Sequence, residues 1–283
     1  MACGSEKEKA EVAKKDMAPN SLQEIHNDLV DILDKVGIIE KLNLGMTIPS
    51  EEDEMEMKDI KGKDISDEDS DDDKNGDNDN NNNDEENDDK EVDASNADKD
   101  HKDKLNNKEN NIEENWLDID EKLEKVHSTW NEYAVEALEK GAINERINNF
   151  NSDLNKATNF IEKREVLDIY NYTSQAIGSL KYFYELYTEE IRGDIAQLQY
   201  QVYQYYIMAI TGDLQAALAS LSNNSEAINR VKLKIKDDEE KLKDIEKISL
   251  AINNLSQALQ ENSRQLFIIK KDIIIEDLKK LAQ

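Results

Sequence analysis

Residues 191–213 read IRGDIAQLQYQVYQYYIMAITGD, and this segment decides the fold. Its apolar side chains recur at helical spacing on two faces, which predicts a helix near 189–211. One face carries Ile191, Ile195, Leu198, Val202 and Tyr205, and the other carries Tyr200, Tyr203, Ile207 and Ile210. A helix that is apolar around much of its circumference belongs at the centre of a bundle. Gly212 and Asp213 then provide a turn and a cap for the next helix.

The segments on both sides of this one show helical spacing on a single face. We expect helices near 114–139, 143–163 and 165–187 before it, and a helix within 214–235 after it. The last stretch keeps a 3-4 spacing through Ile245, Ile248, Ile252, Leu255 and Leu259, and resumes at Leu266, Ile269 and Ile273. That spacing predicts one long helix or, with a cap at Asn262 and Ser263, a helical hairpin with coiled-coil-like packing. The predicted fold class is all-α, an antiparallel bundle or short helical array of six or seven helices over residues 113–283.

The first part of the chain has a different composition. All aromatic residues lie between Trp116 and Phe267, so the preceding residues lack the side chains that dominate core burial. Residues 51–111 contain 26 acidic and 9 basic residues, a net −17 of the chain's −29. High net charge with few large apolar side chains is typical of disorder. We therefore predict a disordered acidic linker over residues 45–112, and we expect no nucleic-acid partner because the chain repels phosphates.

The N-terminus, Met1-Ala2-Cys3-Gly4-Ser5, indicates a lipid anchor. A lone cysteine between small residues is typical of the end of a bacterial lipoprotein cleavage site, and residues 1–18 would form the start of the tether. Under this interpretation a hydrophobic signal segment preceded Cys3, and Met1-Ala2 replaces it. The chain would then lie outside the cytoplasm, attached to the membrane through Cys3. The alternative is a cytoplasmic protein with an incidental cysteine near its start.

The pattern over residues 19–44 predicts a short amphipathic helix that begins after Pro19 and ends at Gly37. The apolar face consists of Leu22, Ile25, Leu29, Ile32, Leu33 and Val36. Such a face packs on another surface, which is either the helical domain of the same chain or a separate protein. These six residues are therefore our candidates for docking a partner.

A further set of residues in the helical part carries a family resemblance. The set consists of Trp116, His127-Ser-Thr-Trp130-Asn-Glu-Tyr133, Lys140-Gly141-Ala142, Asn149-Phe150, Leu154-Asn155 and Thr158. It resembles a group of clostridial-type lipoproteins of unknown function. The resemblance implies a lipidated cysteine, a short helix, an acidic tether and a helical C-terminal domain, and it implies no activity.

Tyrosine is concentrated between Tyr170 and Tyr206, where nine tyrosines and one phenylalanine occur. Tyrosine serves both in semi-polar core layers and at ligand-binding surfaces. Helical spacing favours burial for most of them. The ones off the main stripes, predicted to form a surface for a protein or cell-envelope ligand, are Tyr172, Tyr182, Tyr200 and Tyr206.

Motifs for metal binding and catalysis are incomplete. The first positions of a calcium loop are matched by Asp71, Asp73, Asn75, Asp77 and Asp79. However, Asn82 replaces the bidentate glutamate, so we expect at most weak calcium binding. Glu124 and His127 have the spacing of a di-iron ligand pair, but a second such motif is missing from the sequence. The sequence contains no nucleophile or nucleotide-binding motif, so we predict no cofactor and no enzymatic activity.

Taken together, these patterns predict a non-enzymatic, extracytoplasmic lipoprotein whose helical domain binds a ligand or serves envelope structure. The acidic tether would hold that domain clear of the membrane, because like charges extend such a chain. The alternative is a cytoplasmic helical adaptor or scaffold that binds a protein partner.

Overall fold

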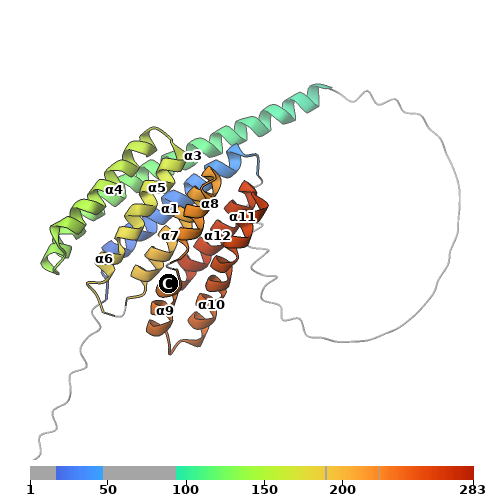
Figure 1. Ribbon diagram of the computed structural model, residues 1–283. Helices are drawn as coiled ribbons and strands as arrows, with labels where there is room; N and C mark the ends of the chain where they lie inside the picture. Colours follow the sequence, from blue (N-terminus) through green and yellow to red (C-terminus); the bar gives the residue numbers. More distant parts are fainter. Residues whose placement is uncertain (1–16, 47–93, 189, 223) are drawn as a thin grey trace, which may run out of the picture. The chain divides into compact units, whose positions relative to one another are not determined.

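The computed structural model describes residues 17–46, 94–188, 190–222 and 224–283 (Figure 1). All regular secondary structure in these residues is helical, which confirms the all-α prediction. The chain divides into two compact units, and residues 17–40 belong to the same unit as residues 114–283. The second unit spans residues 41–113. Cys3, most of the expected linker and the calcium-loop motif lie outside the described residues.

The helices carry the labels of Figure 1. They are α1 (Asn20–Asn43), α3 (Ala94–Glu139), α4 (Asn144–Glu162), α5 (Val166–Ser179), α6 (Lys181–Tyr184), α7 (Arg192–Thr211), α8 (Leu214–Ser220), α9 (Asn224–Lys234), α10 (Glu239–Asn253), α11 (Leu255–Glu261) and α12 (Arg264–Leu281). The expected helix at 165–187 is divided into α5 and α6, and the expected helix within 214–235 is divided into α8 and α9.

The central helix of the large unit is α7, as its two apolar faces predict. It contacts α5, α6, α8, α9 and α12. It is buried on most of its circumference, and even Gln199, Gln201 and Gln204 are buried. Gly212 ends α7 in the left-handed conformation (φ 84°), and the Asp213 side chain caps α8 by accepting a hydrogen bond from the backbone N–H of Ala216. The predicted turn and cap are therefore confirmed.

The C-terminal region forms the helical hairpin that was one of two alternatives. Asn262 takes a left-handed conformation (φ 46°), and the Ser263 side chain caps α12. The Lys241 ammonium at the start of α10 donates to the backbone carbonyl of Leu281 at the end of α12, so the two helices are antiparallel. The buried face of α12 differs from the prediction, because Ile269 and Ile273 are 43% and 51% exposed. The buried set is Phe267, Ile268, Lys271, Ile274, Ile275, Leu278 and Leu281.

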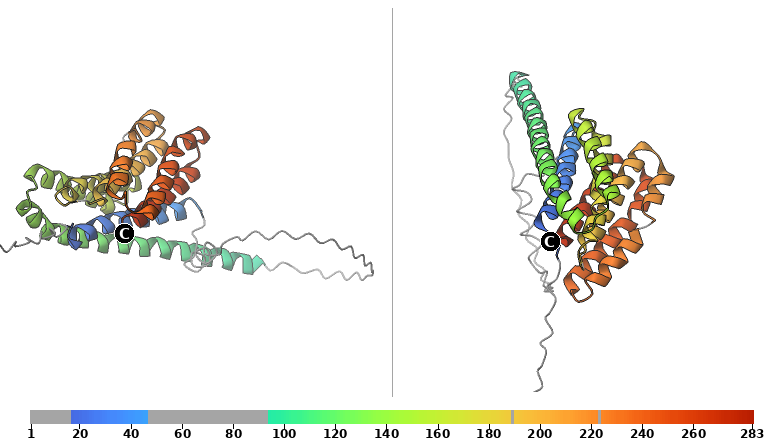
Figure 2. Two further views of the ribbon diagram at one scale, coloured as in Figure 1. Left: turned by 90° about the horizontal axis from the view of Figure 1, so that it is seen from below. Right: turned by 90° about the vertical axis from the view of Figure 1, so that its left-hand side faces the viewer.

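Helix α1 is part of the core of the large unit. The six residues of its apolar face are Leu22, Ile25, Leu29, Ile32, Leu33 and Val36, and each of them is 0% exposed. Figure 2 shows α1 between α3 on one side and α7 and α12 on the other. The partner-docking hypothesis for these residues is therefore wrong, because their apolar surface is already buried within the same unit. We predicted residues 19–44 to be separate from the bundle. The structure instead places the described residues up to Glu40 in the same unit as residues 114–283.

Two helix boundaries differ from those expected. Gly37 does not end α1, which continues to Asn43. A Cβ atom at Gly37 would lie 3.1 Å from the Tyr170 hydroxyl, so glycine here permits close packing on α5. Helix α3 begins at Ala94, within the segment predicted to be unstructured. Extending an existing helix costs much less than starting one, which explains this longer N-terminal end.

Candidate functional site

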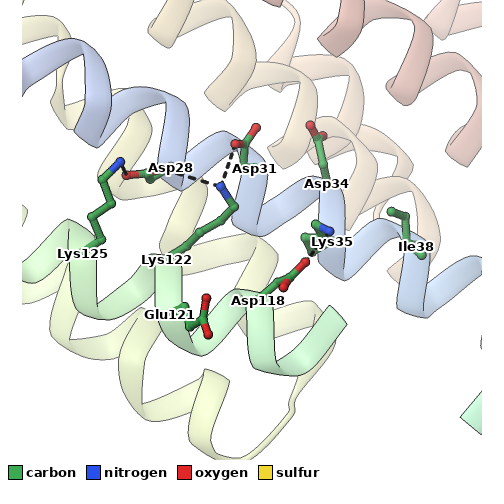
Figure 3. A pocket seen from close by; sticks show the side chains of 9 residues that line it. All are labelled: Asp28, Asp31, Asp34, Lys35, Ile38, Asp118, Glu121, Lys122 and Lys125. Carbon is green, nitrogen blue, oxygen red and sulfur yellow. Dashed lines mark hydrogen bonds and ion pairs between the residues drawn. The ribbon is translucent and has the colours of Figure 1, made fainter. Parts of the chain in front are cut away.

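Several hollows of the large unit are lined by charged side chains, and two of them differ in how those charges are paired. The larger hollow, with a volume of about 670 Å³, lies between α1 and α3. We name it the α1–α3 seam. It is lined by Asp28, Asp31, Asp34, Lys35, Ile38, Asp118, Glu121, Lys122 and Lys125 (Figure 3).

The lysines of the α1–α3 seam are all paired with aspartates across the two helices. Lys35 lies 2.6 Å from Asp118, and its hydrogen bond and charge lower the pKa of that carboxyl. Lys122 lies 2.9 Å from Asp31 and 3.6 Å from Asp28. Partial burial opposes the charge of Lys122, but the hydrogen bonds and charges of these two aspartates together raise its pKa.

The remaining lysine of the seam, Lys125, lies 3.0 Å from Asp28. On the other side of α1, Lys279 of α12 reaches Asp34 at 2.7 Å and Asp31 at 3.5 Å. These pairs fasten α1 to its neighbours. Because the cations of the seam already have carboxylate partners, a ligand would have to displace them, so we assign the seam a structural role.

The second charged hollow, of about 370 Å³, lies between α4 and the α5–α6 corner, and we name it the α4–α6 hollow. It is lined by Arg146, Asn149, Ser152, Asp153, Lys156, Ser179 and Tyr182. Ser152 and Lys156 also line a neighbouring hollow of about 550 Å³ along α4. That neighbouring hollow adds Asn148, Asn151, Asn155, Asn159 and Phe160. The two hollows therefore form one polar surface with aromatic side chains at its edges.

The cations of the α4–α6 hollow rest on aromatic rings. The Arg146 guanidinium carbon lies 3.6 Å from the centroid of the Tyr182 ring. The Lys156 ammonium lies 5.2 Å from the centroid of Tyr172, which itself stacks on Phe160 at 5.1 Å with an interplanar angle of 3°. Within the described residues, neither cation forms an ion pair with a carboxylate. The rings hold the two cations without neutralising them.

The carboxylate of the α4–α6 hollow is influenced by the Lys156 charge but forms no salt bridge with it within the described residues. Asp153 accepts a long hydrogen bond, 3.4 Å, from the Ser179 hydroxyl and forms no ion pair in the part of the chain that the structure describes. Burial raises the pKa of Asp153, against the opposing effects of the Lys156 charge and the Ser179 hydroxyl. Two cations and one carboxylate therefore line the same hollow, and none of the three forms a salt bridge within the described residues. This arrangement can bind a group that carries both a negative and a positive charge.

The structure separates the four tyrosines predicted to form a surface. Tyr182 is 39% exposed and lines the α4–α6 hollow, and the partly exposed Tyr172 supports Lys156. Tyr200 is partly buried against Gly178 of α5. Tyr206 is fully buried and donates a 2.5 Å hydrogen bond to Glu40, so its assignment to a binding surface is wrong. Its position on α7 faces α1, which the sequence pattern did not place in the core.

A buried lysine was missed by the sequence analysis. Lys271 of α12 is 3% exposed, and its ammonium lies 5.3 to 5.7 Å from the ring centroids of Tyr170, Tyr203 and Tyr206. It also pairs with the neighbouring Asp272. Nothing in its position within α12 distinguishes it in the sequence from the exposed lysines of the same helix. It serves packing, because the rings and the carboxylate already surround its charge.

The aromatic residues that carry the lipoprotein resemblance are buried packing residues. Trp130 packs against Phe150 and Phe183, with ring centroids 4.0 and 5.1 Å apart. The indole N–H of Trp130 donates to Asn151 at 2.6 Å, and His127 bonds to Thr158 at 2.8 Å. These contacts join α3 to α4. His127 thus has a structural partner, and the described residues contain no cluster of histidine, cysteine or acidic side chains arranged for a metal ion.

Neither a membrane-spanning helix in the described residues nor a similar known protein assists the assignment of these sites. Over the described ranges, no helix combines the length and the apolar character needed to cross a bilayer. Comparison of the chain with protein-family models, with curated proteins and with solved structures finds no match in any of the three.

Proposed function

We propose that this chain is a non-enzymatic binding protein that is held outside the cell membrane by a lipid on Cys3. Its helical unit binds a ligand with both charges, such as a free amino acid or the end of a peptide, in the α4–α6 hollow. The observation that carries the ligand assignment is the presence of Arg146, Lys156 and Asp153 in one hollow without a salt bridge within the described residues.

The chemistry of the hollow favours a zwitterion over a simple anion. A carboxylate of the ligand would lie between Arg146 and Lys156, whose guanidinium and ammonium groups donate charge-assisted hydrogen bonds. An ammonium of the ligand would lie against Asp153, and the Asp153 carboxylate would then gain a salt-bridge partner. A dianion such as a phosphate monoester is disfavoured because Asp153 repels it. The amides and hydroxyls of Asn149, Ser152 and Ser179 remain for the rest of the ligand.

The membrane attachment is supported by the sequence around Cys3 and by the resemblance to clostridial-type lipoproteins. The acidic segment is not the tether in this proposal, because it joins α1 to α3 of the same unit, and only residues 4–16 separate Cys3 from the first described residues of that unit. A cytoplasmic adaptor, the alternative to this proposal, would have to bind its partner through a surface other than the apolar face of α1, which is buried.

The ligand proposal is tested with a series of small dipeptides on the full chain. Alanylalanine carries both charges, its N-acetyl derivative lacks the ammonium, and its C-terminal amide lacks the carboxylate. In NMR titrations we expect saturable shifts around residues 146–156 with alanylalanine and weaker binding of both blocked forms. Arg146→Ala should remove the preference for a free carboxylate, and Asp153→Asn the preference for a free ammonium. Equal binding of all three dipeptides, or none, contradicts the proposal.

A matched control substitutes a lysine on another surface. Lys243→Ala removes an exposed charge from α10 and should leave dipeptide binding unchanged. The anchor is tested separately by palmitate labelling in the native organism, where Cys3→Ala should abolish incorporation. Unlabelled wild-type protein would refute the lipid anchor and leave the binding proposal standing.

A further inference from the structure

A third hollow, of about 280 Å³, lies among α8, α9 and α10, and we name it the α8–α10 hollow. Its polar lining consists of Ser222, Asn224, Ser225, Asn229, Lys232, Ser249, Asn253 and Ser256. Its apolar lining consists of Leu218, Leu221, Ile228 and Ile252. It shares no lining residue with the α4–α6 hollow.

The unusual member of this lining is Asn224. The residue is 3% exposed, and among the residues that the structure describes neither its side-chain oxygen nor its side-chain nitrogen has a hydrogen-bond partner. Leaving a buried amide unpaired costs about 1–3 kcal/mol, and most buried polar groups in native proteins are paired. An apolar side chain of similar size would avoid this cost. The amide is therefore expected to have a partner that is not part of the chain.

The hollow is suited to an uncharged ligand. Its one charged lining residue, Lys232, lies 3.7 Å from Glu246. Ser222 and Ser256 donate their hydroxyls to the backbone carbonyls of Ala219 and Asn253, at 2.7 and 2.8 Å, and so present lone pairs as acceptors. The other serine and asparagine side chains of the lining can both donate and accept.

We propose that the α8–α10 hollow binds a small uncharged polyhydroxyl molecule, a monosaccharide, whose neighbouring hydroxyl or amide groups pair with the Asn224 side chain. An amide presents one donor and one acceptor side by side, and vicinal hydroxyls or an acetamido group match both. The apolar side chains opposite provide a surface for the C–H face of the sugar ring. Both polar atoms are buried in the free protein, so binding requires the Asn224 side chain to turn toward the hollow.

The decisive variant is Asn224→Leu, because the proposal predicts opposite effects on stability and binding. In the free protein, leucine removes the unpaired amide, and the melting temperature should rise. In NMR titrations with N-acetylglucosamine and with glucose, the wild type should show saturable shifts around residues 224–229 and 249–256. The variant should bind at least tenfold more weakly. N-acetylglycinamide, which lacks the hydroxyls, should bind more weakly than either sugar.

Several results would overturn this proposal. The wild type could fail to respond to both sugars, or Asn224→Leu could bind them as tightly as the wild type does. A tighter response to N-acetylglycinamide than to the sugars would assign the hollow to amides. Ser249→Ala is a second variant, which keeps Asn224 in place. It should weaken sugar binding several-fold. Asn131→Leu, an exposed position on α3, is the matched control and should change nothing.

Discussion

The α1–α3 seam and the α4–α6 hollow both contain lysine and aspartate, but these charges are paired differently in the two. In the seam, lysines of one helix face aspartates of the next, and every lysine has a carboxylate within 4.0 Å. In the α4–α6 hollow, Arg146 and Lys156 rest on tyrosine rings, and Asp153 has only a hydroxyl as partner. The size of a hollow is therefore a poor guide to function here, because the lysines of the larger one are already paired with aspartates.

The largest effect is expected where the seam is anchored in the core. Leu29 of α1 is 0% exposed, so Leu29→Ala should lower the free energy of unfolding by about 2–5 kcal/mol. Urea denaturation of the full chain measures this. Leu117→Ala on α3, where the side chain is 56% exposed, should change stability by less than roughly 0.5 kcal/mol. Equal stability of Leu29→Ala and the wild type would mean that α1 does not belong to the cooperative core.

Acid should change the free energy of unfolding with opposite signs through His26 on α1 and through Asp153 in the α4–α6 hollow. On α1, His26 is buried with hydrogen bonds to Gln199 (2.7 Å) and Tyr184 (3.2 Å). Burial chiefly, and the Arg192 charge, lower the pKa of His26 to about 4, against the raising effect of the Gln199 hydrogen bond. Between pH 6.5 and 4 the unfolded chain takes up a proton that the folded chain does not, so stability is full above pH 6.5 and falls toward pH 4. The loss from this group is about 3 kcal/mol.

The measurement is a series of urea denaturation curves between pH 7 and pH 4. His26→Gln should reduce the slope of stability against pH over this range by about one proton. In the α4–α6 hollow, burial raises the pKa of Asp153, so protonation of that carboxyl favours the folded state as pH falls. Asp153→Asn should therefore steepen the acid loss slightly. An unchanged slope in His26→Gln would show that His26 is not buried in the neutral form.

A pair of matched lysine substitutions tests the comparison directly. Lys122→Ala removes a cation that is shared by Asp28 and Asp31, and it should lower the free energy of unfolding by about 1 kcal/mol. Lys156→Ala removes a cation without a carboxylate partner, and its effect should stay within roughly 0.5 kcal/mol. Raising the salt concentration should shrink the difference, because the seam is partly exposed. Equal losses for the two variants would remove the distinction between the regions.

The smallest expected effect concerns the ring under Arg146. Tyr182→Leu removes the face on which the guanidinium lies at 3.6 Å. Dipeptide binding should weaken roughly two- to fivefold, which corresponds to one exposed cation–π contact. The titration described for the α4–α6 hollow measures it, with Tyr187→Leu as a control because Tyr187 pairs with Lys140 outside the hollow. Unaltered binding in Tyr182→Leu would show that the ring does not position Arg146.

Most of the helical framework could be predicted from the sequence, since it depends on local patterns. The two-faced spacing of α7 predicted its central place, and Gly212, Asp213 and Ser263 marked helix ends through local backbone chemistry. The register of α12 could not be predicted in this way. The run from Leu266 to Ile275 offers two overlapping apolar stripes, and the choice between them depends on which side faces α7 and α10.

The sites were predicted less well, for the same physical reason. Sequence reasoning found Tyr172 and Tyr182 at the edge of the α4–α6 hollow because they lie off the apolar stripes. It did not find Arg146, Lys156 or Asp153, because a charged residue on a helix surface looks the same whether or not it has a partner. It also missed Asn224, whose burial depends on three helices that meet around it.

By itself, the sequence determined that this chain is helical and where its main helices lie, because periodicity and capping act over short distances. Only the tertiary structure decided that α1 completes the core, that Tyr206 and Lys271 are buried, and which charges are paired. Those outcomes depend on distances between residues far apart in the chain, such as the 2.7 Å between Lys279 and Asp34. The sequence pattern of one helix does not show where the neighbouring helix packs, and the pairing of charges between helices depends on that packing.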